Sequence, residues 1–153
     1  MKNKLSLLFA LMVIAGFLQV GFGQITYSVV GDTVTVTDCL DSASGELIIP
    51  SVYNGNPVTA IGDSAFFYCA SLTSVTIPHS VTSIGMNAFA HCPSLTNIEV
   101  VKSNSEYSSQ NGVLFNKYKK KLIQYPEGKT GDQYTIPNSV INIRFINIIN
   151  NLL

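Results

Sequence analysis

Residues 61–77 read IGDSAFFYCASLTSVTI, and residues 84–100 read IGMNAFAHCPSLTNIEV. The two segments carry the same or a similar residue at nine positions that lie 23 residues apart, namely Ile61/Ile84, Gly62/Gly85, Ala65/Ala88, Phe66/Phe89, Cys69/Cys92, Ser71/Ser94, Leu72/Leu95, Thr73/Thr96 and Val75/Ile98. Similarity at a fixed period of this length predicts a solenoid, in which each repeat stacks on its neighbour. Such a stack presents an extended surface, so binding is the activity to expect first.

The pattern inside one unit predicts a strand, a second short strand and a turn. In LTSVTIP (residues 72–78) the apolar side chains are expected to point inward, and the proline ends the strand because it has no N–H to donate. A second apolar run follows at residues 81–84. Gly85 permits a sharp turn. We expect residues 86–91 to form one short helical turn that places Phe89 in the core.

The first 23 residues are predicted to be a secretory signal peptide. Two lysines precede the apolar run 5–17, and Gly21 and Gly23 are small residues at the positions that a signal peptidase recognises, so we expect cleavage before Gln24. The apolar run is about a dozen residues long, which is too short to cross a bilayer. The mature chain of about 130 residues is therefore expected to lack a membrane span and to be secreted or held at the cell surface.

Residues 24–49 are predicted to be an N-terminal β cap. Residues 25–37 alternate and are rich in β-branched side chains, and Gly31-Asp32 interrupts them, which is typical of a hairpin. A further strand is expected at residues 46–49. A solenoid needs such a cap because its first coil would otherwise expose an apolar face and open strand edges.

Repeats are predicted over residues 50–143, with a non-standard β insert at 101–133. Within the insert, two strands are expected at 112–115 and 122–125, joined by a basic turn, and the repeat pattern restarts at 134–140. In residues 144–153 the pattern stops, because Arg144 takes the place of the turn glycine and the aromatic position falls on Ile148. We expect this tail to be atypical and truncated or frame-shifted relative to a longer ancestor.

The pattern CxxLxxVxIPxxVxxIGxxAFxxC, which runs here from Cys69 to Cys92, resembles the BspA-type leucine-rich repeat. The lead-in YSVVGDTVTVTDC and the insert YSSQNGVLFNKYKKKLIQYPEGKTGDQYTIPNSV are similar to segments that accompany these repeats, so the resemblance covers about residues 25–143. It implies a short, curved, β-rich leucine-rich-repeat solenoid on an exported or surface protein, usually bacterial. Members are associated with adhesion to host matrix proteins or cells, and full-length members are much longer than this chain.

The charge balance excludes a typical nucleic-acid binder. After the signal peptide, seven Lys and Arg residues face nine Asp and Glu residues, whereas nucleic-acid binding proteins are strongly basic. The four lysines within residues 117–121 could contact an acidic polysaccharide, but we favour a solvated hairpin tip whose charges discourage edge pairing.

Catalytic, metal-binding and cofactor-binding residues are not expected. The two histidines, His79 and His91, occupy different repeat positions, and a His91–Cys92 pair would need two adjacent side chains to face each other. Asp38 and Asp41 fall in a polar loop and are interpreted as turn residues. Three Cys and two His spread over the chain do not supply the converging ligands of a zinc site. We therefore expect a protein that is not an enzyme.

The cysteines allow more than one interpretation. Cys69 and Cys92 share one repeat position, and we favour a buried ladder of small apolar side chains there. A Cys69–Cys92 disulfide is the alternative and requires that adjacent coils bring the two Cα atoms within about 7 Å. Whether Cys39 pairs stays open.

The outward residues of the main sheet form the candidate ligand-binding face: Thr73, Ser74, Thr76, Thr96, Asn97 and Glu99. By register, Glu46 and Ile48 are expected to precede them, and Gln133 and Thr135 to follow. Hydroxyl and amide groups can pair with a partner's backbone or with sugar hydroxyls. We expect an extracellular protein or glycan as the ligand, including host matrix, with weak single contacts that gain from many copies.

Two other interpretations remain beside this binding function. The coils could be a structural spacer, or the chain could be an inactive fragment of a longer repeat protein. An uncapped C-terminal edge would also favour self-association, because open strand edges pair with one another.

Overall fold

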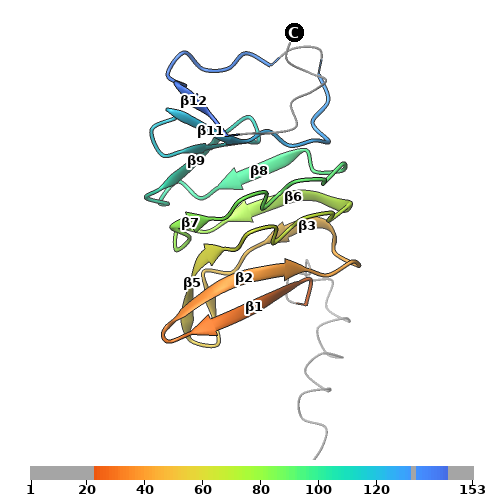
Figure 1. Cartoon of the computed structure of the whole chain (residues 1–153), viewed down its shortest axis with the longest axis vertical. Helices are drawn as coiled ribbons and strands as arrows, with labels where there is room; N and C mark the ends of the chain where they lie inside the picture. Colours follow the sequence, from red (N-terminus) through yellow and green to blue (C-terminus); the bar gives the residue numbers. More distant parts are fainter. Residues whose placement is uncertain (1–22, 132–133, 145–153) are drawn as a thin grey trace, which may run out of the picture.

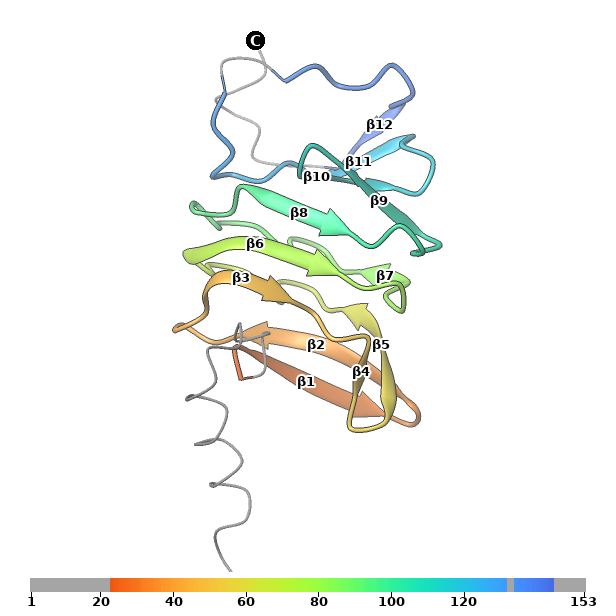
Figure 2. The same ribbon diagram turned by 180° about the vertical axis from the view of Figure 1, so that it is seen from behind.

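The computed structural model describes residues 23–131 and 134–144, which form a stack of flattened β coils. The strands are β1 Ile25–Val30, β2 Thr33–Cys39, β3 Ser44–Ile48, β4 Val52–Tyr53, β5 Asn56–Ile61, β6 Ser71–Ile77, β7 Ser83–Ile84, β8 Asn97–Val100, β9 Tyr107–Gln110, β10 Val113–Asn116, β11 Lys121–Gln124 and β12 Asn142–Ile143. Figures 1 and 2 show the stack from two sides, with β1 at one end and β12 near the other. The predicted solenoid is confirmed.

The strands of the coils form two walls, and β9 to β12 form a further sheet above them. In the first wall, β3, β6 and β8 are parallel and in register, so Val75 lies opposite Leu47 on one side and Ile98 on the other. In the second wall, β5 pairs in parallel with β2 and with β7, while β1 and β4 add antiparallel strands. The second apolar run, residues 81–84, therefore consists of the strand β7 and the two residues before it.

The two walls enclose one continuous apolar core. Leu72, Val75 and Ile77 have no exposed surface, as their alternation predicts. Phe66 and Phe89 are buried and stack with their ring centroids 5.1 Å apart and their planes 4° from parallel. Burial of a large apolar side chain contributes roughly 1.5–3 kcal/mol, and here each coil provides the surface that covers the next.

The prediction of a helical turn at residues 86–91 is wrong. Asn87 and His91 have φ angles of 53° and 58°, and their partners one coil earlier, Ser64 and Tyr68, have φ angles of 56° and 61°. A left-handed residue at every fourth position prevents a right-handed helix from forming. The described residues contain no helix, and hence none long and apolar enough to span a membrane.

Backbone hydrogen bonds join the stacked turns instead. The N–H groups of Ser64, Phe66 and Tyr68 donate to carbonyl groups of the next coil, over 2.9, 2.7 and 3.2 Å respectively. Gly85 is required at the start of this turn, because a Cβ atom there would lie 2.5 Å from both Asp63 Oδ1 and the carbonyl carbon of Gly62. The glycine in the repeat therefore lets consecutive coils approach closely.

The N-terminal hairpin is confirmed, with β1 and β2 joined through Gly31-Asp32. The next predicted strand is β3, which pairs with β6 as the first strand of the first wall. A second hairpin, β4–β5, fills the insertion before Ile61. Its turn residues Asn54 and Gly55 have φ angles of 50° and 85°, and positive φ at both positions is typical of a two-residue β-hairpin turn.

The insert contains the two strands expected, β10 and β11, and an additional strand, β9, which pairs with β10. Asn104 attaches the insert to the coil below it and has no exposed surface. Its Nδ2 donates to Pro78 O and Val81 O over 2.8 and 2.9 Å, and its Oδ1 accepts from the N–H groups of Glu106 and Tyr107. This buried amide thus uses four hydrogen bonds to hold the corner.

The repeat restart at residues 134–140 is confirmed only in part. Residues 134–136, which match the end of β6 in sequence, form no strand. The half-buried side chains of Tyr134 and Ile136 pack against the small insert core of Val113, Phe115, Leu122 and Tyr125, and Thr135 is exposed. The pattern returns at β12, which corresponds to β7 and pairs in parallel with β11. The signal peptide, apart from Gly23, and residues 145–153 of the predicted tail lie outside the described residues.

Candidate binding face

The six predicted face residues lie together on the first wall, on strands β6 and β8 and just before β8. The sheet register places Ser74 opposite Asn97 and Thr76 opposite Glu99. Thr73, Thr96 and Glu99 are exposed, and the other three are half-buried. Glu46 and Ile48 precede them in register, as expected. The structure therefore confirms the placement of these side chains, whereas their role in binding stays a prediction.

Several of these polar groups bond to one another along the stack. Thr96 Oγ1 donates to Thr73 O over 3.2 Å, and Asn97 Nδ2 donates to Ser74 Oγ over 3.2 Å. A hydroxyl keeps a second acceptor lone pair after donating its proton. A ligand that lies on this face would thus meet an ordered row of oxygen acceptors rather than freely rotating side chains.

The sequence predicts that residues 133 and 135 continue the face beyond β8, and the structure differs from this prediction at Thr135. Thr135 is not in a strand and does not continue the row, and Gln133 lies outside the described residues. Gly112 of the insert occupies the next position, where its carbonyl accepts the N–H of Ile98 over 2.9 Å. A Cβ atom on Gly112 would lie 2.6 Å from Asn97 Oδ1, so a glycine is needed for this approach. The insert thus covers the upper edge of β8.

The favoured interpretation of the cysteine ladder is wrong for Cys69, and so is the alternative Cys69–Cys92 disulfide. Cys69 instead forms a disulfide with Cys39, and their Cα atoms are 6.6 Å apart. Cys39 ends β2, so the N-terminal hairpin brings it beside the first turn. This covalent bond ties the hairpin to the first repeat.

Cys92 is the free cysteine among the described residues, and it is buried. Its Sγ donates to Phe66 O over 2.9 Å. Burial raises the pKa of the Cys92 thiol to about 11, and the nearby Glu127 carboxylate adds to the rise. The His91 ring stacks on Tyr68 with the centroids 4.9 Å apart. A thiol that stays protonated at neutral pH is a poor nucleophile, so the surroundings of Cys92 do not activate it.

A family comparison identifies the repeats. The model of the BspA type leucine-rich repeat region matches residues 46–152 in six copies. The chain belongs to the BspA-type leucine-rich repeat family. The matched range includes residues 144–152, which the sequence analysis sets apart as an atypical tail. A search of curated proteins found no match.

The chain is also similar to solved leucine-rich repeat structures. A leucine-rich repeat protein of T. pallidum is 22% identical with a TM-score of 0.52, and the match covers 78% of this chain and 50% of that one. The BspA-type chain thus spans about half the length of that protein. A leucine-rich repeat protein of Bacteroides capillosus is 28% identical with a TM-score of 0.48, over 85% of this chain and 97% of that one. A leucine-rich cell surface protein of Faecalibacterium prausnitzii is 23% identical with a TM-score of 0.46, over 79% and 41% of the two chains.

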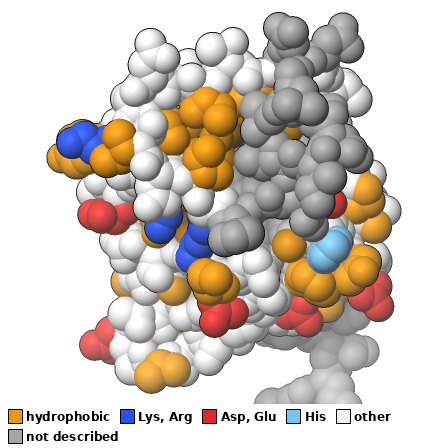
Figure 3. Space-filling model, turned by 45° about the horizontal axis from the view of Figure 1, so that its top comes forward, with side chains coloured by type: hydrophobic (Ala, Val, Ile, Leu, Met, Phe, Trp, Pro, Cys, Tyr) orange, Lys and Arg blue, Asp and Glu red, His pale blue; other side chains and the backbone are white. Residues whose placement is uncertain are grey.

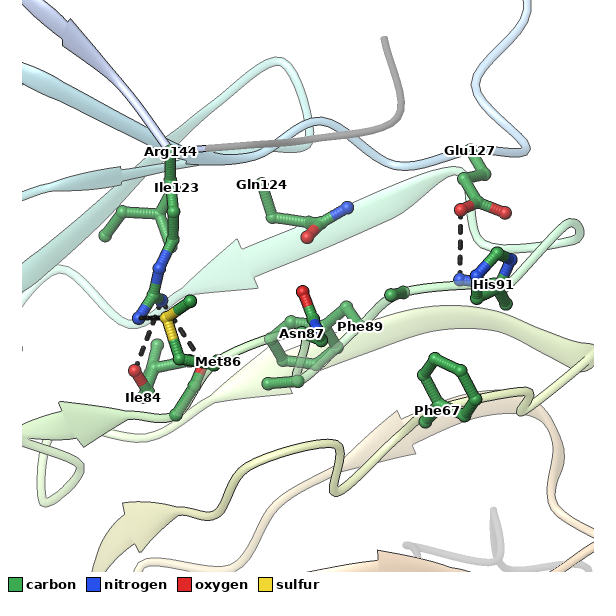
Figure 4. Close-up of a pocket in the computed structure, with 13 residues that line it drawn as sticks. Phe67, Ile84, Met86, Asn87, Phe89, His91, Ile123, Gln124, Glu127 and Arg144 are labelled. Atoms are coloured by element: carbon green, nitrogen blue, oxygen red, sulfur yellow. Dashed lines mark hydrogen bonds between the residues drawn. The ribbon is translucent and has the colours of Figure 1, made fainter. Parts of the chain in front are cut away.

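A groove that the sequence did not predict lies beside the second repeat turn, residues 84–91 (Figure 4). It has a volume of about 220 Å³ and lies between residues 84–91 and the insert residues Ile123, Gln124 and Glu127, with Arg144 at one end. The Arg144 guanidinium donates from Nη1 to Ile84 O and Gly85 O over 3.3 and 3.2 Å. The Glu127 carboxylate accepts the N–H of His91 over 2.9 Å.

An aromatic cluster at the outer end of the same turns was also missed. Phe67 lies edge-on to both Tyr68 and His91, with centroids 4.8 and 5.0 Å apart, and its side chain is 40% exposed. Figure 3 shows hydrophobic side chains gathered around a histidine on one face of the molecule. The signal was present in the sequence, because Tyr68 and His91 occupy one repeat position directly before the cysteine.

The lysines of the insert are partly used inside the protein. Lys117 Nζ donates to the carbonyls of Lys102 and Asn104, and Lys119 Nζ donates to Gln110 Oε1 over 2.7 Å. Lys120 and Lys121 are exposed. Lys117 and Lys119 are thus half-buried and bonded within the protein, so the favoured interpretation as a solvated hairpin tip fits only Lys120 and Lys121 of this basic run. No group of three or more His, Cys, Asp or Glu side chains in the described part of the chain is placed to hold a metal ion.

Proposed function

We propose that this chain is an exported, non-catalytic leucine-rich-repeat module that binds an extracellular protein or glycan across its first wall, as a secreted or cell-surface adhesion module. The observation that carries the proposal is the ordered polar face on β6 and β8, on which hydroxyl, amide and carboxylate groups repeat from coil to coil. Repeat stacks commonly present such extended binding surfaces.

Two further observations support an extracellular site of action. The predicted signal peptide would export the chain, and the Cys39–Cys69 disulfide is of the kind that forms and persists in oxidising compartments. Family membership and the inert surroundings of His91 and Cys92 support a protein without catalysis.

The face should bind weakly at any one coil. The face carries no Trp or Arg, which are enriched among the residues that contribute most to binding energy at interfaces. Most of its side chains are short. We infer that useful affinity comes from many copies of the module displayed together, because each added contact then raises the effective concentration of the next.

The chain offers a matched pair of threonines for the test. Thr96 on the face and Thr82 near β7 are both exposed, and each donates its hydroxyl to the carbonyl of a threonine one coil below, over 3.2 and 3.4 Å. The mature chain is displayed multivalently and tested on a glycan array and on immobilised collagen, fibronectin and laminin.

Thr96→Glu should weaken binding to whichever probe is retained by about tenfold or more, and Thr82→Glu should leave it unchanged. Equal effects of the two variants, or no binding to any of the probes, would contradict the proposed face. Circular dichroism and urea unfolding of both variants confirm that the fold is intact.

A structural spacer is the second candidate function. The contacts of Thr96 with Thr73 and of Asn97 with Ser74 favour it, because these polar groups already stabilise the stack. A spacer would show no loss of binding in Thr96→Glu, but its thermal stability would fall.

A further inference from the structure

An open pocket on the insert shares no lining residue with the groove beside the second repeat turn. It has a volume of about 550 Å³, a size typical of small-molecule sites. One side is the tip of the β9–β10 hairpin, at Gln110 and Asn111, and the other is the loop that precedes β12, at residues 134–138. Both sides lie towards the β12 end of the stack (Figure 2). We call this site the insert pocket.

The hairpin side of the insert pocket has a fixed shape. Asn111 and Gly112 form the two-residue turn, with φ angles of 53° and 77°, between the paired residues Gln110 and Val113. Lys119 Nζ donates to Gln110 Oε1 over 2.7 Å. This bond leaves the two N–H groups of the Gln110 amide for another acceptor, and the ammonium behind the amide polarises them into stronger donors.

The loop side is anchored to the same lysine. The N–H of Val140 donates to Pro137 O over 2.9 Å and closes a turn. Ser139 Oγ, within that turn, donates to Lys119 O over 2.9 Å. Lys119 therefore joins the two sides of the pocket, because its ammonium holds Gln110 and its carbonyl holds Ser139. The pocket is thus built before any ligand arrives.

Several polar groups of the pocket are available to a ligand. The side chains of Asn111, Thr135 and Asn138 are exposed and form no hydrogen bond with another residue that the structure describes. The hydroxyl oxygen of Tyr134 is buried and likewise has no partner within the described ranges. A buried hydroxyl in a native protein normally has a hydrogen-bond partner, and a ligand oxygen that reaches Tyr134 would supply one.

The lining also indicates the chemical class of the ligand. Amide and hydroxyl groups both donate and accept hydrogen bonds, as the hydroxyl groups of a sugar do. Tyr134, Ile136 and Pro137 are half-buried and add apolar surface on which the C–H groups of a sugar ring can lie. None of the lining residues is Asp, Glu, Lys, Arg or His, so a charged ligand would lose hydration there without gaining an ion-pair partner.

We propose that the insert pocket binds a neutral saccharide. Its hydroxyl groups bond to the side-chain amides of Gln110, Asn111 and Asn138, and its ring lies on the apolar side chains of the loop. This site goes beyond the proposed binding face on the first wall, because the two share no residue. The hairpin turn separates them, since Gly112 packs against Asn97 of that face.

Soluble trisaccharides test the insert pocket directly. Chitotriose, mannotriose and cellotriose are the neutral probes, and sialyllactose is the acidic probe. Saturation-transfer NMR and calorimetry on the mature chain measure their binding. At least one neutral probe should bind, and sialyllactose should bind at least about tenfold more weakly, because its carboxylate meets no cation in the lining.

Two variants and a matched control locate the bound sugar. Gln110→Glu keeps an acceptor for Lys119 but removes the N–H donors, and Asn138→Ala removes a whole amide. Each should weaken binding of the neutral probe by about tenfold, because it removes hydrogen bonds to the ligand. Asn142→Ala should leave binding unchanged, since this exposed asparagine is on β12 and does not line the pocket. Urea unfolding checks that all three variants keep the fold.

The opposite results are equally clear. Absence of binding by all three neutral probes would overturn the proposal, and so would a preference for sialyllactose or equal effects of Asn138→Ala and Asn142→Ala. A sugar whose binding is lost in Thr96→Glu but kept in Asn138→Ala would lie on the first wall. That result would overturn the insert pocket and leave the proposed binding face standing.

Discussion

The repeat coils, residues 61–100, and the flanking segment, residues 101–144, are held to their neighbours in different ways. The coils join through backbone groups: parallel strands in both walls and the row of N–H donors from Ser64 to Tyr68. The flanking segment makes separate backbone bonds, such as those of Gly112 O with Ile98 N–H and of Gly128 N–H with Leu95 O, and adds particular side chains, namely Asn104, Ser109, Glu127 and Arg144. Backbone stacking needs only the repeat pattern, whereas side-chain attachment depends on single residues that no period reveals.

The largest effect is expected in the shared core of the coils. Phe89→Ala should lower the free energy of unfolding by about 3–5 kcal/mol, because it removes a fully packed ring between two coils. Tyr118→Ala is the control, since that side chain is 78% exposed and should change stability by less than about 0.5 kcal/mol. Urea unfolding measures both. A Phe89→Ala value no larger than the control would mean that the two coils do not share a core.

The Cys39–Cys69 disulfide ties the N-terminal hairpin to the first repeat turn. Without it, the hairpin should be held by noncovalent contacts alone, as the flanking segment is at the other end of the stack. Replacing Cys39 and Cys69 by alanine opens a loop spanning 30 residues, for which the loss is about 3–4 kcal/mol. The β1–β2 hairpin should then exchange its amide protons earlier than β6 and β8. Retention of full stability and protection would show that hairpin packing alone holds this end.

A smaller loss is expected where one side chain attaches the flanking segment. Asn104→Ala removes four hydrogen bonds and leaves the Pro78 and Val81 carbonyls without that donor, at a cost of about 2–3 kcal/mol. Asn104→Asp keeps the acceptor oxygen and should retain the bonds from Glu106 and Tyr107. Hydrogen exchange should show the insert opening while β6 and β8 remain protected. Uniform loss of protection would contradict the separation of the two regions.

The smallest expected effect is on the pH dependence of stability, through the Cys92 thiol in the second repeat turn. The Cys92 thiol has a pKa raised from 9.0 to about 11 by burial. Above about pH 9 the unfolded chain loses this proton while the folded protein keeps it, so stability should fall as pH rises from 9 towards 11 and should not change on this account below pH 9. Cys92→Ser should flatten this part of the pH profile of thermal unfolding. Identical profiles for the two proteins would assign the alkaline loss to other groups.

The sequence predicted the features that follow from the 23-residue repeat, namely which side chains point into the core and which point outward. The spacing between Phe66 and Phe89, and the inward set in β6, follow from apolar residues at equivalent positions, because a solenoid coil can bury its apolar side chains only against another coil. The outward set on β6 and β8 follows from the same alternation. The six outward side chains do lie together on the first wall, and their role in binding stays a prediction.

The rest depends on contacts between segments that share no pattern. Cys39 lies outside the repeat, and its bond to Cys69 depends on how the N-terminal hairpin packs against the first turn. The left-handed conformation of Tyr68 has no residue signal, because tyrosine, unlike glycine, asparagine or the histidine at position 91, is not enriched at positive φ. Asn104 and Arg144 act through side chains that reach across the stack, and their sequence neighbourhood does not indicate their targets.

The donor row on the turn at residues 62–68 has a consequence for how such a protein can change in length. The upper surface of one turn matches the lower surface of the next: the N–H donors of this row reach carbonyl groups 22 residues later, and the N–H of Met86 reaches Asp63 Oδ1 23 residues earlier. A tandem duplication of residues 62–84 would thus bring its own complementary surfaces on both sides. Duplication of one whole unit should preserve the fold, while an insertion within residues 62–68 should break the donor row; the β4–β5 hairpin shows that an insertion outside this turn is tolerated.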